Sequence, residues 1–162
     1  MAPSTLGTFL RAFTFGHVRQ LEAVVGKAIE RAWGLRAGPA GMLVIDVDST
    51  ICEVHGYAKQ GAAYGYTKVR GYHPLLATRA DTGEVLHARL RKGSANTARG
   101  IVRFVDELLA RLERGGAGEA IIVRADSGFF QHKLLDRLSR AGVGFSVTIH
   151  QRAPVRAAID AI

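Results

Sequence analysis

The sequence contains a single cysteine, Cys52, among its 162 residues. One thiol excludes an internal disulfide and a zinc site built from cysteines. No stretch reaches the roughly 20 apolar residues that a membrane-spanning helix needs. The N-terminus also lacks the basic region and long apolar block of a secretory signal. These absences favour a protein of a reducing cytosol, and we expect a cytoplasmic location with no attachment to a membrane.

Acidic residues are also scarce, with 14 Asp and Glu against 22 Lys and Arg, which gives a net charge of +8. The imbalance is local. Residues 46–58 carry three acidic residues and no basic one, whereas residues 59–103 carry nine basic residues against two acidic ones, a net +7. A basic segment beside a carboxylate cluster suits a polyanion that meets a bound metal ion, and nucleic acid is the obvious candidate. The alternative is a solvated basic face that aids solubility.

The length and the 48% hydrophobic content suit one domain with a real core, preceded by an arm. Residues 1–40 are predicted to form the helical arm, with helices over 4–13 and 17–34 and a break from Gly34 to Gly41. Residues 41–162 are predicted to form the core domain. The second helix carries an apolar stripe at helical spacing, made of Val18, Leu21, Val25 and Ile29.

The most informative stretch is residues 42–50, an apolar run that leads into Asp46 and Asp48. In a strand, successive side chains alternate between the two faces, so these two carboxylates point the same way. Burying unpaired carboxylates is costly. Such a pair therefore indicates a metal ion, a phosphoryl group or a basic partner, and the structural alternative is a turn that caps a helix.

The rest of the chain predicts an α/β domain. Short apolar runs at 72–79 and 85–90 flank an Asp-Thr-Gly turn, which is typical of a hairpin of antiparallel strands. A helix over 96–114, a strand over 120–124 that leads to Asp126, a further helix and a strand over 145–149 follow.

The two apolar runs that end in aspartate are expected side by side, because ligand sites in such sheets gather at strand ends. Asp48 and Asp126 would then meet. Two or three carboxylates at one place suit Mg²⁺, which prefers oxygen ligands. Two such ions about 3.5–4 Å apart can stabilise both the attacking and the leaving oxygen of a phosphodiester reaction.

Five short motifs occur in order between residues 42 and 150: Val44–Thr50, Val54–Gly56 with Gly61–Gly65, Gly71–Leu76, Leu90–Gly93 and Ile122–Phe129. Together they resemble the catalytic domain of bacterial insertion-sequence transposases of the DDE type. The resemblance implies a ribonuclease H-like fold. Its five-stranded mixed sheet has an antiparallel meander of strands 1–3, then parallel strands 4 and 5, with flanking helices.

The resemblance also implies a catalytic Asp-Asp-Glu triad that binds two Mg²⁺ or Mn²⁺ ions in the intact enzyme. The first Asp matches Asp48, with Asp46 as the alternative or as a supporting metal ligand, and the second matches Asp126. The family's Glu lies on a later helix that this sequence does not reach, and the usual N-terminal DNA-binding domain is missing. We therefore expect a fragment truncated at both ends, which alone lacks the third catalytic carboxylate and is inactive.

The family's partners are DNA, both transposon ends and target DNA, and a second copy of the transposase; we expect a homodimer in the intact protein and association with the bacterial nucleoid. Candidate phosphate contacts are Arg91, Lys92 and Arg70, for which a solvated surface role is the alternative. We interpret His73 as a hydrogen-bonded structural histidine. Core packing is preferred to base stacking for three tyrosines, Tyr64, Tyr66 and Tyr72.

One rival family shares the opening motif. Asp-x-Asp-x-Thr after an apolar strand also resembles the haloacid-dehalogenase-like phosphatases, in which Asp46 would be the phosphoryl nucleophile and Asp48 the general acid. That fold needs a parallel sheet. The hairpin expected directly after Asp48 argues against it.

Overall fold

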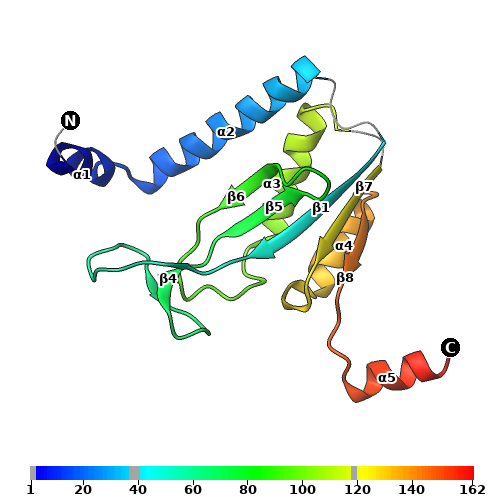
Figure 1. The fold of residues 1–162 in the computed structure, drawn as a ribbon. Helices are drawn as coiled ribbons and strands as arrows, with labels where there is room; N and C mark the ends of the chain where they lie inside the picture. The colour runs from blue at the N-terminus through cyan, green and yellow to red at the C-terminus, as the bar shows by residue number, and fades with distance from the viewer. Residues whose placement is uncertain (1–2, 37–40, 118–119) are drawn as a thin grey trace.

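The computed structural model describes residues 3–36, 41–117 and 120–162, without the side chains of Phe15 and Arg36. The helices are α1 (Pro3–Arg11), α2 (Phe15–Arg36), α3 (Ile101–Arg114), α4 (His132–Arg140) and α5 (Ala153–Asp160), with a 3₁₀ turn η1 (Ser127–Phe129). The strands are β1 (Met42–Ser49), β2 (Cys52–Glu53), β3 (Ala63–Tyr64), β4 (Arg70–Tyr72), β5 (Leu75–Arg79), β6 (Val85–Arg89), β7 (Ala120–Ala125) and β8 (Gly144–Val147) (Figure 1).

The main sheet has five strands in the order β6-β5-β1-β7-β8. Strands β1, β5 and β6 form an antiparallel meander, while β7 runs parallel to β1 and β8 runs parallel to β7. This arrangement confirms the predicted ribonuclease H-like topology. It also contradicts the phosphatase alternative, because the two strands that follow β1 into this sheet run antiparallel.

One face of the sheet forms the core with α3 and α4. Along β1 the buried residues alternate as Leu43, Ile45 and Val47, and they belong to one cluster with Phe104 and Leu134 from the helices. Asp46 and Asp48 therefore point to the other face, as the two-residue period requires. The core side chains fix the register that brings the two carboxylates to this open face.

Helix α3 begins at Ile101, five residues later than predicted. The segment before it forms turns instead. The Asn96 side chain accepts the Ala98 N–H at 3.0 Å, and Gly100 takes a left-handed conformation with φ of 78°. Local side chain to backbone bonds of this kind compete with helix formation. The predicted end of this helix at residue 114 is confirmed, since α3 ends at Arg114.

The arm packs on α3 and β6 through polar groups and through part of the predicted apolar stripe. Ile29 of the stripe packs against the core, whereas Leu21 is 57% and Val25 46% exposed and both line a shallow hollow with Leu90. The described residues of α2 that are buried are Gly26 and Trp33, and the Trp33 indole donates to the Glu84 carboxylate at 3.0 Å. A Cβ at Gly26 would lie 2.9 Å from the Arg111 guanidinium, so the glycine makes room for that side chain. The predicted break at 34–41 falls mostly on residues 37–40, outside the described residues.

A buried histidine lies beneath this contact. His87 is 2% exposed, stacks on Phe104 with ring centroids 4.5 Å apart, and lies 3.3 Å from the Glu107 carboxylate. Burial, together with the charges of Arg111 and Arg89, lowers the pKa of His87 to about 4. Burial would raise the pKa of Glu107, but the Arg19 hydrogen bond and the Arg89 charge outweigh it and hold that pKa at about 2.

These two groups predict that the fold loses stability in acid. The folded-state pKa of His87 lies below its ordinary 6.5, so the unfolded chain binds more protons as the pH falls from 6.5 to 4. The loss across that window is about 3 kcal/mol, and Glu107 adds to it from pH 4.5 to 2. Urea unfolding at a series of pH values measures this loss.

His87→Phe should flatten the slope of unfolding free energy against pH between pH 6.5 and 4, whereas His150→Phe, at an exposed position, should leave that slope unchanged. An unchanged slope in His87→Phe would contradict the assignment.

A second, small sheet was not predicted from the sequence. Strands β2, β4 and β3 pair in that order within residues 50–74, which join β1 to β5 and which we call the tyrosine lobe. Figure 1 shows it projecting from the sheet beyond the end of β1. Strands of two or three residues are too short to give a periodic pattern in the sequence. Of the helices in the described ranges, none is both long and apolar enough to cross a membrane.

Candidate metal centre

The carboxyl ends of β1, β7 and β8 form a hollow of about 470 Å³ on the open face of the sheet. Polar side chains dominate its lining, and three of them are carboxylates. The polar lining residues are Asp46, Asp48, Arg124, Asp126, Ser146 and Thr148.

Strand register explains how Asp48 and Asp126 come together. The parallel pairing of β1 with β7 ends with Val47 opposite Ala125. Asp48 and Asp126 each follow this last pair by one residue, so they stand at the same level along the two strands. The sequence-based expectation that the two aspartates meet at neighbouring strand ends agrees with this geometry.

Asp48 is exposed, and neighbouring groups orient it. Its Oδ1 accepts the Ser49 N–H at 2.6 Å, and the Ser49 hydroxyl lies 2.9 Å from Nε2 of the fully buried His73. Nδ1 of His73 lies 2.8 Å from the Ala95 carbonyl oxygen, which can only accept. In the neutral ring Nδ1 therefore carries the hydrogen, and Nε2 accepts from Ser49. His73 is thus a hydrogen-bonded structural histidine, as interpreted, and it holds the residue after Asp48.

Asp126 caps the turn that follows β7. Its Oδ1 accepts the Gly128 N–H at 2.9 Å and caps η1, while helix α4 begins only at His132. A Cβ at Gly128 would lie 2.9 Å from the Thr97 methyl group, so a glycine here lets the turn pack closely. The tight turn fixes the Asp126 carboxylate at the mouth of the hollow.

Asp46 is engaged differently, by a residue that sequence reasoning missed. Arg124 donates to both Asp46 oxygens, at 2.6 and 2.7 Å. This hydrogen bonding lowers the pKa of Asp46 despite some burial, and it raises the pKa of Arg124. The available signal was positional: Arg124 stands two residues before Asp126 on β7 and directly opposite Asp46 in the parallel register. Asp46 therefore shares the hollow with Asp48, but its oxygens are already paired.

The three predicted phosphate contacts lie in different environments. The Arg91 guanidinium donates to the carbonyl oxygens of His73, Asn96, Thr97 and Arg99 at 2.7–3.0 Å. Burial, and then the charge of Arg89, lowers the pKa of Arg91. Arg70 donates to the carbonyls of Gly56 and Tyr57, so it also holds its own backbone. Lys92 is exposed. A phosphate role for these three residues stays a prediction.

The donor set of the hollow is one of hard oxygens, from carboxylates and from the Ser146 and Thr148 hydroxyls, which fits Mg²⁺ or Mn²⁺ better than soft metals. In the part of the chain that the structure describes, no three His, Cys, Asp or Glu residues gather as a metal-binding group. With Asp46 paired to Arg124, the carboxylates left for a cation are Asp48 and Asp126.

Residues 2–162 match the family model described as Transposase DDE domain group 1. Among solved structures, the fold is similar to the piggyBac transposase synaptic complex with hairpin DNA, with a TM-score of 0.52 and 14% identity; the match covers 72% of this chain and 25% of that one. Mos1 transposase in a paired-end complex matches with a TM-score of 0.43 and 14% identity, over 82% of this chain and 42% of that one. The HTLV-2 integrase catalytic core in complex with magnesium matches with a TM-score of 0.42 and 12% identity, over 74% of this chain and 64% of that one. No curated protein matches the sequence.

Proposed function

We propose that this chain, which belongs to the group 1 family of transposase DDE domains, uses Asp48 and Asp126 to bind Mg²⁺ or Mn²⁺ for the cutting and joining of DNA strands. The observation that carries the proposal is the position of two exposed aspartates, Asp48 and Asp126, at one level of neighbouring strands and in one hollow. No other pair of carboxylates in the described residues lies at neighbouring strand ends in this way.

Each residue of the hollow has a distinct task in this proposal. Bound divalent ions supply positive charge for attacking and leaving oxygens, and the family resemblance implies two of them. Asp48 and Asp126 act as metal ligands and do not transfer protons in the reaction. Ser49 and His73 keep the Asp48 carboxylate oriented. Arg124, held by Asp46, presents a cation beside the ions for a DNA phosphate.

Full activity needs a third carboxylate in such a site, and Asp46 is paired to Arg124 instead. We therefore infer that the chain alone binds metal weakly and does not transfer strands. Its proposed substrates are transposon ends and target DNA, handled by a homodimer in the bacterial nucleoid. The chain spans 25% of the piggyBac transposase chain it matches, so activities of a whole transposase are proposals here.

Titration of the chain with MnCl₂, followed by calorimetry or electron paramagnetic resonance, tests the metal site. We expect weak, saturable binding, and absence of binding at millimolar Mn²⁺ would contradict the site. Incubation with a duplex that carries the element's ends, with Mg²⁺ or Mn²⁺, tests the activity. We expect no joined products. Robust strand transfer that Asp126→Ala abolishes would show that two carboxylates suffice and would overturn the inference of inactivity.

A further inference from the structure

All four tyrosines of the chain fall within residues 57–72, in the tyrosine lobe. Three of them are exposed: Tyr57 is 92% accessible, Tyr64 64% and Tyr66 75%. Tyr72 is half-buried and donates its hydroxyl hydrogen to the Gln60 carbonyl at 2.9 Å. The preference for core packing is therefore wrong for Tyr64 and Tyr66. Three exposed aromatic rings on one small lobe leave a large stacking area open to solvent.

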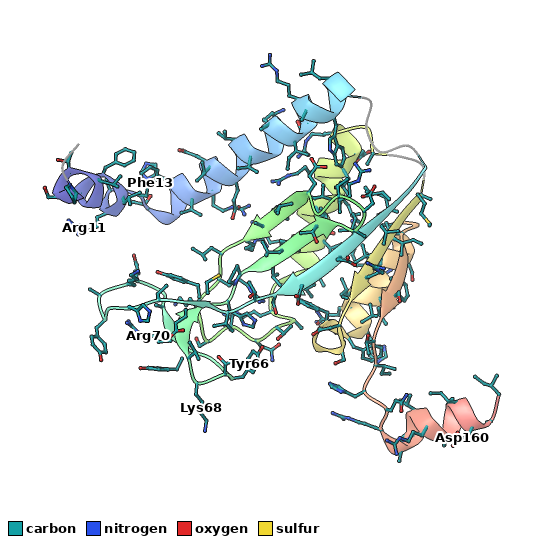
Figure 2. The ribbon with its side chains drawn as sticks, viewed as in Figure 1. Arg11, Phe13, Tyr66, Lys68, Arg70 and Asp160 are labelled. Atoms are coloured by element: carbon teal, nitrogen blue, oxygen red, sulfur yellow. The ribbon has the colours of Figure 1, made fainter. Side chains whose placement is uncertain are left out.

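The lobe is also free of negative charge over most of its length. No Asp or Glu occurs from residue 54 to residue 80. Lys59, Lys68 and Lys92 are exposed, and Lys92 joins the lobe through a β-bridge to Tyr72. None of these three lysines forms an ion pair with a carboxylate of the described residues. The exposed lysines and tyrosines give the lobe positive and aromatic groups, of which Figure 2 labels Tyr66 and Lys68.

Close backbone packing holds the strands and loops of the lobe together. A Cβ at Gly93 would lie 2.1 Å from the Gly71 carbonyl oxygen and 2.3 Å from that of Ala63. A Cβ at Gly65 would lie 2.6 Å from the Gly93 carbonyl oxygen. Arg70 further ties down the loop through its bonds to the Gly56 and Tyr57 carbonyls. A preorganised platform loses little conformational entropy when it binds a partner.

Lys68 stands at the tip of the β3–β4 turn, where Figure 2 shows its side chain directed outward. Its φ of 57° makes it the one non-glycine residue with a left-handed backbone in the described part of the chain. The Lys68 N–H donates to the Gly65 carbonyl at 3.1 Å and closes the turn. A glycine would adopt this conformation at lower cost, so Lys68 carries a local backbone penalty. Contact with a polyanion would explain it.

The lobe is continuous with the metal centre. The Tyr66 ring lies 5.8 Å from the His73 ring, His73 is bonded to Ser49, and Ser49 donates to Asp48. Three contacts thus join an exposed tyrosine to a proposed metal ligand. The lobe therefore lies close to the proposed metal ligand Asp48.

We propose that the tyrosine lobe binds unpaired DNA next to the metal centre. Tyr64 and Tyr66 stack on bases, and Lys59, Lys68 and Lys92 contact the phosphates. Stacking requires bases whose faces are free, which single-stranded DNA offers and a closed duplex does not. The position beside the reacting phosphate rests on the proposed function, but the binding of single strands by the lobe does not depend on metal.

Fluorescence anisotropy with a labelled 20-nucleotide single strand and with the matching duplex, both in EDTA, tests the lobe without metal chemistry. Stacking contributes about 1–3 kcal/mol per base, so Tyr64→Ala and Tyr66→Ala should each weaken single-strand binding by roughly 5-fold to 150-fold. Duplex binding should change less than 2-fold. Tyr64→Phe and Tyr66→Phe keep the ring and should retain affinity. Lys68→Ala should weaken the binding of both the single strand and the duplex. It should also reduce the slope of log affinity against log salt concentration by about 1.

The matched control is Phe13→Ala, which removes an exposed aromatic ring from the arm and should change neither affinity. Circular dichroism confirms that each variant is folded. Equal losses for single strand and duplex in the tyrosine variants, loss in the phenylalanine variants, or no loss at all would each overturn the proposal. Failure of the metal site leaves these measurements unaffected, so the two proposals fail separately.

Discussion

Replacing Asp126 by alanine is expected to weaken Mn²⁺ binding by about 100-fold, because a direct ligand is removed and changes in outer-shell partners alone already cost 10–100-fold. Asp48→Ala should weaken Mn²⁺ binding by a similar factor. Each aspartate supplies a carboxylate at the mouth of one hollow, and the exposed position of both makes a folding defect small. Calorimetric titration with MnCl₂ at pH 7 measures the effect, and thermal melts confirm the fold.

Asp81→Ala is the matched control. Asp81 is an exposed aspartate held by Arg79, as Asp46 is held by Arg124, but it lies in the β5–β6 hairpin. Its loss should leave Mn²⁺ affinity within 2-fold. If Asp126→Ala binds Mn²⁺ as tightly as Asp81→Ala does, the site assignment is wrong.

Asp46→Asn decides which aspartate of β1 is the first ligand. The amide removes the charge that binds Arg124 but preserves the shape of the side chain. With Asp48 as the ligand, we expect Mn²⁺ affinity to fall by only a few fold, since Arg124 loses its partner beside the cation. A loss larger than that of Asp48→Asn would make Asp46 the ligand instead.

The main sheet could be predicted because its signals are local and strong. β1 and β7 are apolar runs that end in aspartate, and Gly83, with φ of 71°, closes the hairpin where Asp-Thr-Gly predicted it. The same-face position of Asp46 and Asp48 follows from the two-residue period of a strand. These features depend on neighbours in sequence, so they need no knowledge of the fold.

Pairing across strands could not be predicted in the same way. The bond from Arg124 to Asp46 depends on the parallel register of β1 and β7, which core packing sets. The Arg91 contacts depend on the backbone path of residues 96–99, where turns stand in place of the expected helix. The tyrosine lobe depends on the absence of side chains at glycines such as Gly93, where backbones approach closely.

Phe104→Ala is expected to cost about 3–5 kcal/mol of unfolding free energy, the largest stability effect we anticipate from one substitution. The ring is fully buried between α3 and the sheet, and it stacks on His87 while the Arg89 guanidinium lies 5.8 Å from its centre. Truncation removes these contacts and leaves a cavity. Urea unfolding at pH 7 measures the loss. Phe130→Ala, which removes a ring that is 38% exposed, should cost less than about 1 kcal/mol.

The same variant should also change the response to acid. His87 has a pKa of about 4 chiefly because it is buried. Water that enters the cavity left by Phe104 would hydrate the imidazolium and move this pKa back toward 6.5, so the unfolded and folded states would bind protons more equally. Phe104→Ala is therefore expected to be less stable at pH 7 yet to lose less stability between pH 6.5 and 4. A slope as steep as that of the wild type would mean that the cavity collapses and that His87 remains dry.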